Sequence, residues 1–294
     1  MRRLVLLALV GLGAQLVDGS LGMGYGVTSA TLLVAGGVGP AAASAAIHFS
    51  EIGTSLVSGI SHHTLGNVDW RTVGVLALPG FVGAFAGATL LVNLDAQVAV
   101  PVVATILVVL GTYVTYRFLS AARRLHFGPR PAKRMLAPVG LVAGTLDAVG
   151  GGGWGPVGTS SLLASGRLEP RKVVGSVDTA EFVVAVGGSL GFLVGLGTHG
   201  IEWAYVGALM LGGLVAAPLA AVVVRFLPAR VLGVAAGGLI VLTNLTTLAE
   251  QLGATGVTVG MIAAAVFTLW VLWVAWAVKL DQDTEIVHRV AQHI

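Results

Sequence analysis

The feature that most constrains this chain is a duplicated glycine-rich break inside an apolar stretch. Asp18 precedes the first break, at 20–26, and Asp147 precedes the second, at 150–156, with the same spacing of glycines and one aromatic residue. Further matched pairs follow in order along both halves: Glu51 with Glu181, Trp70 with Trp203, and Gly74 with Gly207. A repeated apolar segment that glycine interrupts is the usual sequence indication of a transporter's binding site.

Composition places this duplication in a membrane. The chain is 56% hydrophobic and 10% charged, whereas a soluble domain has about 25% charged residues. Several stretches exceed the roughly 20 apolar residues that a membrane-spanning helix needs. The sequence has no cysteine, which excludes disulfides and thiolate metal sites. Its net charge of +3 comes from loop arginines and indicates orientation in the bilayer, not nucleic-acid binding. We expect a multi-pass protein of the cytoplasmic membrane, with the lipid bilayer as its partner.

Hydropathy and breaker residues predict four segments in each half and a ninth segment without a counterpart. The first half has 4–37 (broken at 19–26), 40–62, 70–92 and 96–118; the second has 135–166 (broken at 150–156), 171–196, 202–224 and 229–248; the ninth is 256–278. The predicted organisation is repeat 1 at 1–118, a basic cytoplasmic linker at 119–134, repeat 2 at 135–250, an extra transmembrane helix at 255–279 and a short cytoplasmic tail at 280–294.

Loop charges distinguish the possible topologies. If every segment crosses once, Lys and Arg are spread almost evenly over both sides. If both broken segments are re-entrant, all of the 16 Lys and Arg except Arg2 and Arg3 lie inside, as the positive-inside rule requires. The sequence therefore predicts an all-α integral membrane protein with two inverted-topology repeats, each a re-entrant segment plus three transmembrane helices, followed by one extra helix. A topology in which 4–37 crosses the membrane and only 135–166 is re-entrant also agrees with the positive-inside rule, so the sequence does not decide whether 4–37 spans or is re-entrant.

Two hairpins that enter from opposite faces would bring the two breaks together near the midplane. Irregular backbone at this depth needs protein or water around it, and half-helices that start near Val27 and Pro156 would point their N-termini there. We expect the substrate to bind at the breaks and first turns; for Trp154, packing is an equal alternative. The predicted binding residues are Gly22, Gly24, Tyr25, Gly26, Thr28, Ser29, Gly151, Gly152, Gly153, Trp154, Gly155, Thr159 and Ser160.

These motifs resemble the TauE/SafE family of membrane transporters, which is associated with export of sulfite and organosulfonates. The likeness covers most of residues 5–250, and the stretches that carry it are 20–26, 40–51, 66–71, 150–156 and 175–178. The resemblance implies two inverted halves with an anion path between them. The breaks differ, since the second has four successive glycines and then Pro156 while the first has spaced glycines and Val27. The first break is therefore expected to bind less directly.

Six titratable residues inside the predicted segments are expected to couple transport to protons: Asp18, His48, Glu51, Asp147, Asp178 and Glu181. Charged groups at membrane depth are costly and usually functional. His48 and Glu51 are three residues apart, and so are Asp178 and Glu181, so each pair shares a helix face. Capping of loose backbone at the breaks is the alternative role for Asp18 and Asp147.

Within the predicted spans, Lys and Arg occur only in the first or last two residues. Backbone N–H groups and hydroxyls would have to bind an oxyanion, and helix dipoles offset its charge only if the acids carry protons. The residues alone fit an anion or a cation; the resemblance to the TauE/SafE family favours a secondary transporter that exports a small sulfur-containing oxyanion by alternating access. A divalent-cation transporter that uses the same acids and an anion channel remain alternatives. The sequence has no signature of an enzyme, and we expect no cofactor and no resident metal. His62 and His63 are interpreted as an ordinary cytoplasmic loop.

Overall fold

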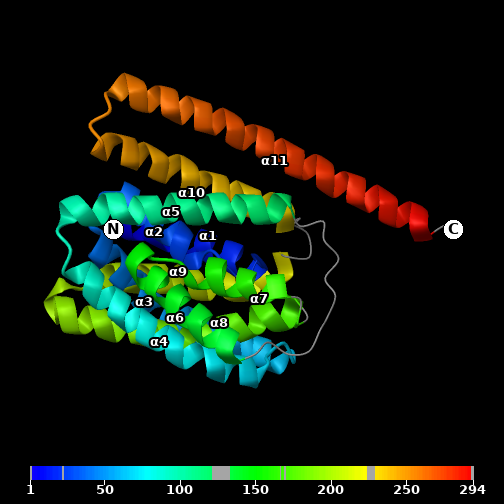
Figure 1. Ribbon diagram of the computed structural model, residues 1–294, viewed down its shortest axis with the longest axis horizontal. Helices are drawn as coiled ribbons and strands as arrows, with labels where there is room; N and C mark the ends of the chain where they lie inside the picture. The colour runs from blue at the N-terminus through cyan, green and yellow to red at the C-terminus, as the bar shows by residue number, and fades with distance from the viewer. Residues whose placement is uncertain are drawn as a thin grey trace.

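The computed structural model describes residues 2–21, 23–120, 133–165, 167–168, 170–223 and 229–292, and these form helices and short connections without strands. The helices of the first half are α1 (Arg2–Leu21), α2 (Tyr25–Ala35), α3 (Pro40–Thr64), α4 (Trp70–Val92) and α5 (Ala96–Leu119). Those that follow are α6 (Lys133–Gly150), the π-helical turn η1 (Trp154–Thr159), α7 (Ser160–Ser165), α8 (Pro170–Leu196), the 3₁₀ turn η2 (Thr198–Gly200), α9 (Trp203–Val223), α10 (Ala229–Gln251) and α11 (Gly256–Gln292). Figure 1 shows the long helices lying side by side along one direction.

The predicted segments agree closely with these helices. For α4 the agreement extends to both ends. Its start is fixed by Asp69, whose side chain accepts the Thr72 N–H at 2.9 Å and so caps the first turn. Three boundaries differ by a few residues or more. The half-helices begin at Tyr25 and Trp154, two residues before the predicted starts near Val27 and Pro156, and α11 continues beyond the predicted apolar segment to Gln292. Most of the predicted linker, residues 121–132, lies outside the described residues.

Five of the described helices are long and apolar enough to cross a membrane. They lie at Trp70–Val92, Gln97–Leu119, Lys172–Leu196, Gly233–Gln251 and Gly256–Gln282. α3 has 25 residues but is more polar, because it carries His48, Glu51 and several Ser and Thr side chains. The protein is therefore an all-helical, multi-pass membrane protein, as the composition predicted.

Glycine lets the main helices approach each other at backbone distance. α6 packs along α4, where a Cβ on Gly144 would collide with the Gly80 carbonyl and a Cβ on Gly83 with the Leu141 carbonyl. α1 packs along α9 in the corresponding way, through Gly11 against the Leu209 backbone. Small residues at such contacts are typical of membrane helix pairs. The partners are exchanged between the halves, since α1 corresponds to α6 and α9 to α4.

The chain directions follow from these contacts. α6 runs parallel to α4, and α8 also runs parallel to α4, because Gly187 lies against Phe81 and Gly195 against Val92. The segment between α6 and α8, formed by η1 and α7, therefore returns the chain to the end where α6 began (Figure 1). α3 and α8 cross the molecule in opposite directions, with Gly188 packed on His48 and Gly59 on Thr179.

Candidate functional site

The two glycine-rich breaks touch each other. A Cβ on Gly152 would overlap the backbone of Gly26 and Val27, and a Cβ on Gly26 would overlap the backbone of Gly151. Gly151 also has a φ of 70°, and Gly24 of the first break has a φ of 135°, which side chains other than glycine rarely adopt. The prediction that the two breaks lie together is therefore confirmed, and glycine is needed there for both space and conformation.

Acidic side chains hold both breaks in shape. Asp147 Oδ1 accepts the N–H groups of Gly153 and Trp154 at 2.7 and 3.0 Å. Asp18 Oδ1 accepts the N–H of Tyr25 at 3.4 Å. A carboxylate that binds N–H groups at a helix start satisfies donors that the helix itself cannot. These bonds reach the first residue of each half-helix and agree with the capping role considered for both aspartates.

The aromatic residue of each break is buried and bound to backbone. Trp154 is 1% exposed, and its Nε1–H donates to the Val177 carbonyl at 2.9 Å. The Tyr25 hydroxyl donates to the Leu209 carbonyl at 3.3 Å and lies 3.0 Å from Ser50 Oγ. Both rings therefore fix a break against a neighbouring long helix, which is the packing role considered for Trp154.

The six predicted titratable residues gather into two clusters. The first cluster consists of His48, Glu51 and Asp147, and the second consists of Asp178, Glu181 and Asp18; in each, one ligand atom per residue lies within 4.8 Å of the others. Each cluster takes two residues from the long helix of one half (α3 or α8) and an aspartate from the break of the other half. The predicted pairing on a helix face is confirmed. The third member of each cluster is an addition that only the tertiary structure provides.

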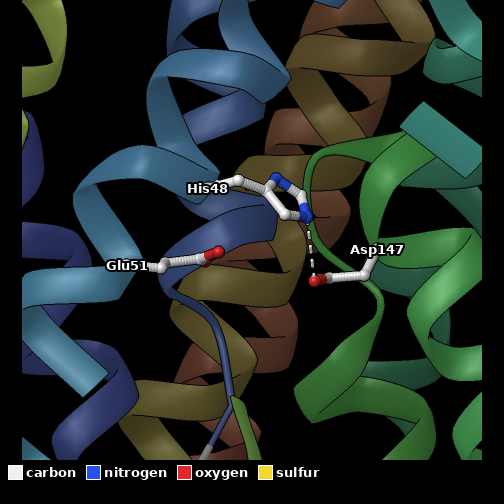
Figure 2. Close-up of side chains that lie close together, drawn as sticks. All are labelled: His48, Glu51 and Asp147. Atoms are coloured by element: carbon white, nitrogen blue, oxygen red, sulfur yellow. Dashed lines mark ion pairs between the residues drawn. The ribbon is translucent and has the colours of Figure 1, made fainter. Parts of the chain in front are cut away.

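The first cluster contains a short contact between the halves. His48 Nε2 lies 3.3 Å from Asp147 Oδ2, and both side chains are almost fully buried. Figure 2 shows the Glu51 carboxylate pointing from α3 toward this pair. Glu51 is 2% exposed, and neither of its carboxylate oxygens has a hydrogen-bond partner among the described residues.

The second cluster extends toward the surface through a histidine that the sequence analysis had placed in a loop. His62 belongs to the last turn of α3, and its Nε2 lies 3.7 Å from Asp178 Oδ2. The His62 side chain is 20% exposed, compared with 7% for Asp178. The loop interpretation was therefore wrong for His62, because α3 continues to Thr64 before Gly66 turns the chain with a φ of 69°. His63 instead contacts the Trp70 ring.

The remaining predicted binding residues lie around the junction of the breaks. The hydroxyls of Thr28 and Ser29, on α2, are buried without a hydrogen-bond partner among the described residues. Thr159 and Gly155 are buried in η1. Ser160 begins α7, and Gly22 lies outside the described residues. The binding role of this set stays a prediction.

The chain is similar to known membrane transporters. The family model "Sulfite exporter TauE/SafE" matches residues 7–247. The chain is 48% identical over 255 residues to a protein of Bacillus subtilis (strain 168) named "Probable membrane transporter protein YtnM", and the match covers 85% of this chain and 84% of that protein. No solved structure matches. The matched region contains both breaks and both clusters. The chain belongs to the sulfite exporter TauE/SafE family and is a multi-pass transporter of the cell membrane.

Proposed function

We propose that the protein exports a small sulfur-containing oxyanion, such as sulfite or a sulfonate, in exchange with protons by alternating access. The observation that carries this proposal is the junction of the breaks, where the N-termini of α2 and η1 meet beside two buried acid clusters. The first turn of a helix presents N–H groups and partial positive charge to an anion. The description of the family as a sulfite exporter supports the substrate class and the direction.

Alternating access fits two inverted halves, which we propose for this chain. α3 and α8 are repeat counterparts and run antiparallel, because His48 lies against Gly188 while Gly59 lies against Thr179. α5 and α10 are also counterparts and also run antiparallel, with Phe118 against Gly233 and Gly111 against Ile240. Counterparts that run in opposite directions support an inverted repeat, with α1–α2 and α6–η1–α7 as hairpins from opposite faces.

We assign the coupling proton to the second cluster. Three carboxylates within 4.8 Å cannot all be ionised in a buried site without a large electrostatic cost. The charged groups that face Glu181 are all acidic: Asp18 of α1, Glu51 of α3, Asp147 of α6 and Asp178 on its own helix. Protons taken up here would reduce the negative charge beside the anion path, which Lys and Arg at the ends of the spans do not offset at this depth.

Flux of sulfite in proteoliposomes across an imposed pH gradient tests this function. We expect an opposing proton gradient to drive sulfite movement in the wild type, and Glu181→Gln to abolish the response to the gradient because its amide cannot bind and release a proton. Glu202→Gln is the control, since the same change is made at an exposed acid. A Glu181→Gln protein that still follows the gradient would overturn the assignment.

A divalent cation is the second candidate cargo, and the two buried ligand clusters favour it. Carboxylates with an imidazole suit ions such as Ni²⁺ and Mn²⁺. The same proteoliposomes, loaded with a divalent cation in place of sulfite, decide between the two. Movement of the cation without movement of sulfite or a sulfonate would replace the anion assignment.

A further inference from the structure

We propose that the first cluster is a binding site for one divalent transition-metal ion, with His48 Nε2, Asp147 Oδ2 and the Glu51 carboxylate as its ligands (Figure 2). The site lies beside the junction of the breaks but does not depend on which ion the protein exports. The three side chains are oriented toward one another, and their separations and combined charge suit a divalent ion.

The surroundings of His48 direct one nitrogen into the cluster. His48 Nδ1 lies 2.9 Å from the Ser44 carbonyl oxygen, which can only accept, so Nδ1 carries a proton. In the neutral ring Nε2 then has its lone pair free, and it faces Asp147. The ring is held by an edge contact with Phe192 and by Gly188, where any Cβ would collide with it. A histidine whose second nitrogen donates to a carbonyl is the usual arrangement of a metal ligand.

Hydrogen bonds also fix the orientation of the Asp147 carboxylate. Its Oδ1 accepts two backbone N–H groups of the second break, which fixes the carboxylate plane. Its Oδ2 has no hydrogen-bond partner among the described residues and faces His48. The Ser44 hydroxyl donates to the Ala148 carbonyl at 2.7 Å. Ser44, whose carbonyl orients His48, therefore also connects α3 to α6. One oxygen of Asp147 is therefore structural and the other is available.

A purely structural role does not explain why the Glu51 carboxylate is buried without a hydrogen-bond partner among the described residues. Its carboxylate is buried, has no hydrogen-bond partner on either oxygen within the described part of the chain, and points into the cluster. Burying a carboxylate without a partner costs several kcal/mol. A cation bound between Glu51, His48 and Asp147 would supply the missing interaction.

Distances and charge agree with a metal ion. Ligands about 2.0–2.2 Å from one ion are separated by about 3 Å or slightly more, and His48 Nε2 lies 3.3 Å from Asp147 Oδ2. One ligand atom from each of the three residues lies within 4.8 Å of the others, so an ion bound here would have to draw the Glu51 carboxylate closer to the His48–Asp147 pair. A neutral imidazole, two carboxylates and a divalent ion together carry no net charge. The second cluster has a third carboxylate in place of the imidazole, which is why we assign protons there and the metal here.

Titration with Co²⁺ tests the site, because the visible spectrum of this ion reports its coordination. The purified full-length wild type, treated with a chelator and freed of it, should bind one Co²⁺ per chain with a ligand-field band. Glu51→Gln should weaken binding by about 100-fold or more, since loss of supporting groups alone costs 10- to 100-fold. His199→Asn and Glu202→Gln remove exposed groups of the same kinds and should keep wild-type affinity.

A second measurement on the wild type does not depend on a variant that folds. Pulsed electron paramagnetic resonance of bound Mn²⁺ should show coupling to one imidazole nitrogen, because His48 is the nitrogen ligand. A wild type that binds neither ion, or that binds Mn²⁺ without nitrogen coupling, overturns the proposal and leaves a proton shared by His48 and Asp147. Sulfite flux measured in chelator separates this outcome from failure of the proposed export function, since flux without metal would leave that function standing.

Discussion

Asp147 performs two separate tasks with its two oxygens, and substitution can separate them. Asp147→Asn keeps Oδ1 as an acceptor for the Gly153 and Trp154 N–H groups. Asp147→Ala leaves both donors buried without a partner, at about 1–3 kcal/mol for each. We therefore expect a clear fall in the thermal unfolding temperature in detergent for the alanine variant and a small change for the asparagine variant. Equal unfolding temperatures for the two variants would show that these bonds do not hold the break.

The sequence could identify the pairs of each half but not their partners. His48 and Glu51 share a helix face because they are three residues apart, and the same spacing joins Asp178 and Glu181. Asp147 reaches His48 only because the second break passes beside α3, and no local pattern encodes that. A signal for His62 was present, however. No glycine or proline lies between His62 and Gly66, so the helix had no reason to end before His62.

At the scale of elements, the positions of the two breaks were easier to predict than the first residues of the half-helices that follow them. Gly24 and Gly151 have positive φ, which favours glycine, so the positions of both breaks can be read from where glycine clusters in the sequence. The start of each half-helix depends instead on which N–H groups an upstream aspartate binds. Pro156 does lie in the first turn of η1, as predicted, but the helix starts two residues before it. The continuation of α11 beyond the apolar segment was missed because hydropathy reports the membrane, not the helix.

The contact between the breaks should depend on the absence of a single side chain. In Gly152→Ala the new Cβ meets backbone atoms of Gly26 and Val27, which cannot rotate away as a side chain would. Overpacking of this kind costs about 1–3 kcal/mol. We expect a lower unfolding temperature and loss of sulfite flux. Gly158→Ala is the matched control in η1, because its Cβ would meet Val177 at an ordinary 3.5 Å. Two variants with the same flux would argue against a functional junction.

At the scale of the whole molecule, the sequence predicted an all-helical membrane protein and the positions of most of its long helices. Hydropathy predicted the helices and duplication predicted two matched halves, because both patterns are repeated over many residues. The exchange of partners between halves, with α1 on α9 and α6 on α4, was not predicted. It arises because α1 and α6 each pack against a long helix of the other half through glycine, and small residues allow many such pairings. Both titratable clusters result from this exchange.

The orientation of the whole molecule gives the last prediction. The Arg3 guanidinium lies 5.2 Å from the centre of the Tyr205 ring, so the start of α1 and the start of α9 share one end of the molecule. The turn after α3 lies at the other end, since His62 contacts Asp178 near the start of α8. The positive-inside rule places the second end in the cytoplasm. Single cysteines can report this directly, because the chain has none of its own.

We expect Arg2→Cys and Glu202→Cys to react in intact cells with a maleimide that does not cross membranes. Leu65→Cys, at an exposed position in the turn after α3, should react only after permeabilisation. Reaction of all three in permeabilised cells is the control for accessibility. Protection of residue 2 together with reaction of residue 202 would place the start of α1 inside. Segment 4–37 would then cross the membrane, and the halves would no longer be related by inversion, because only the second would begin with a re-entrant hairpin.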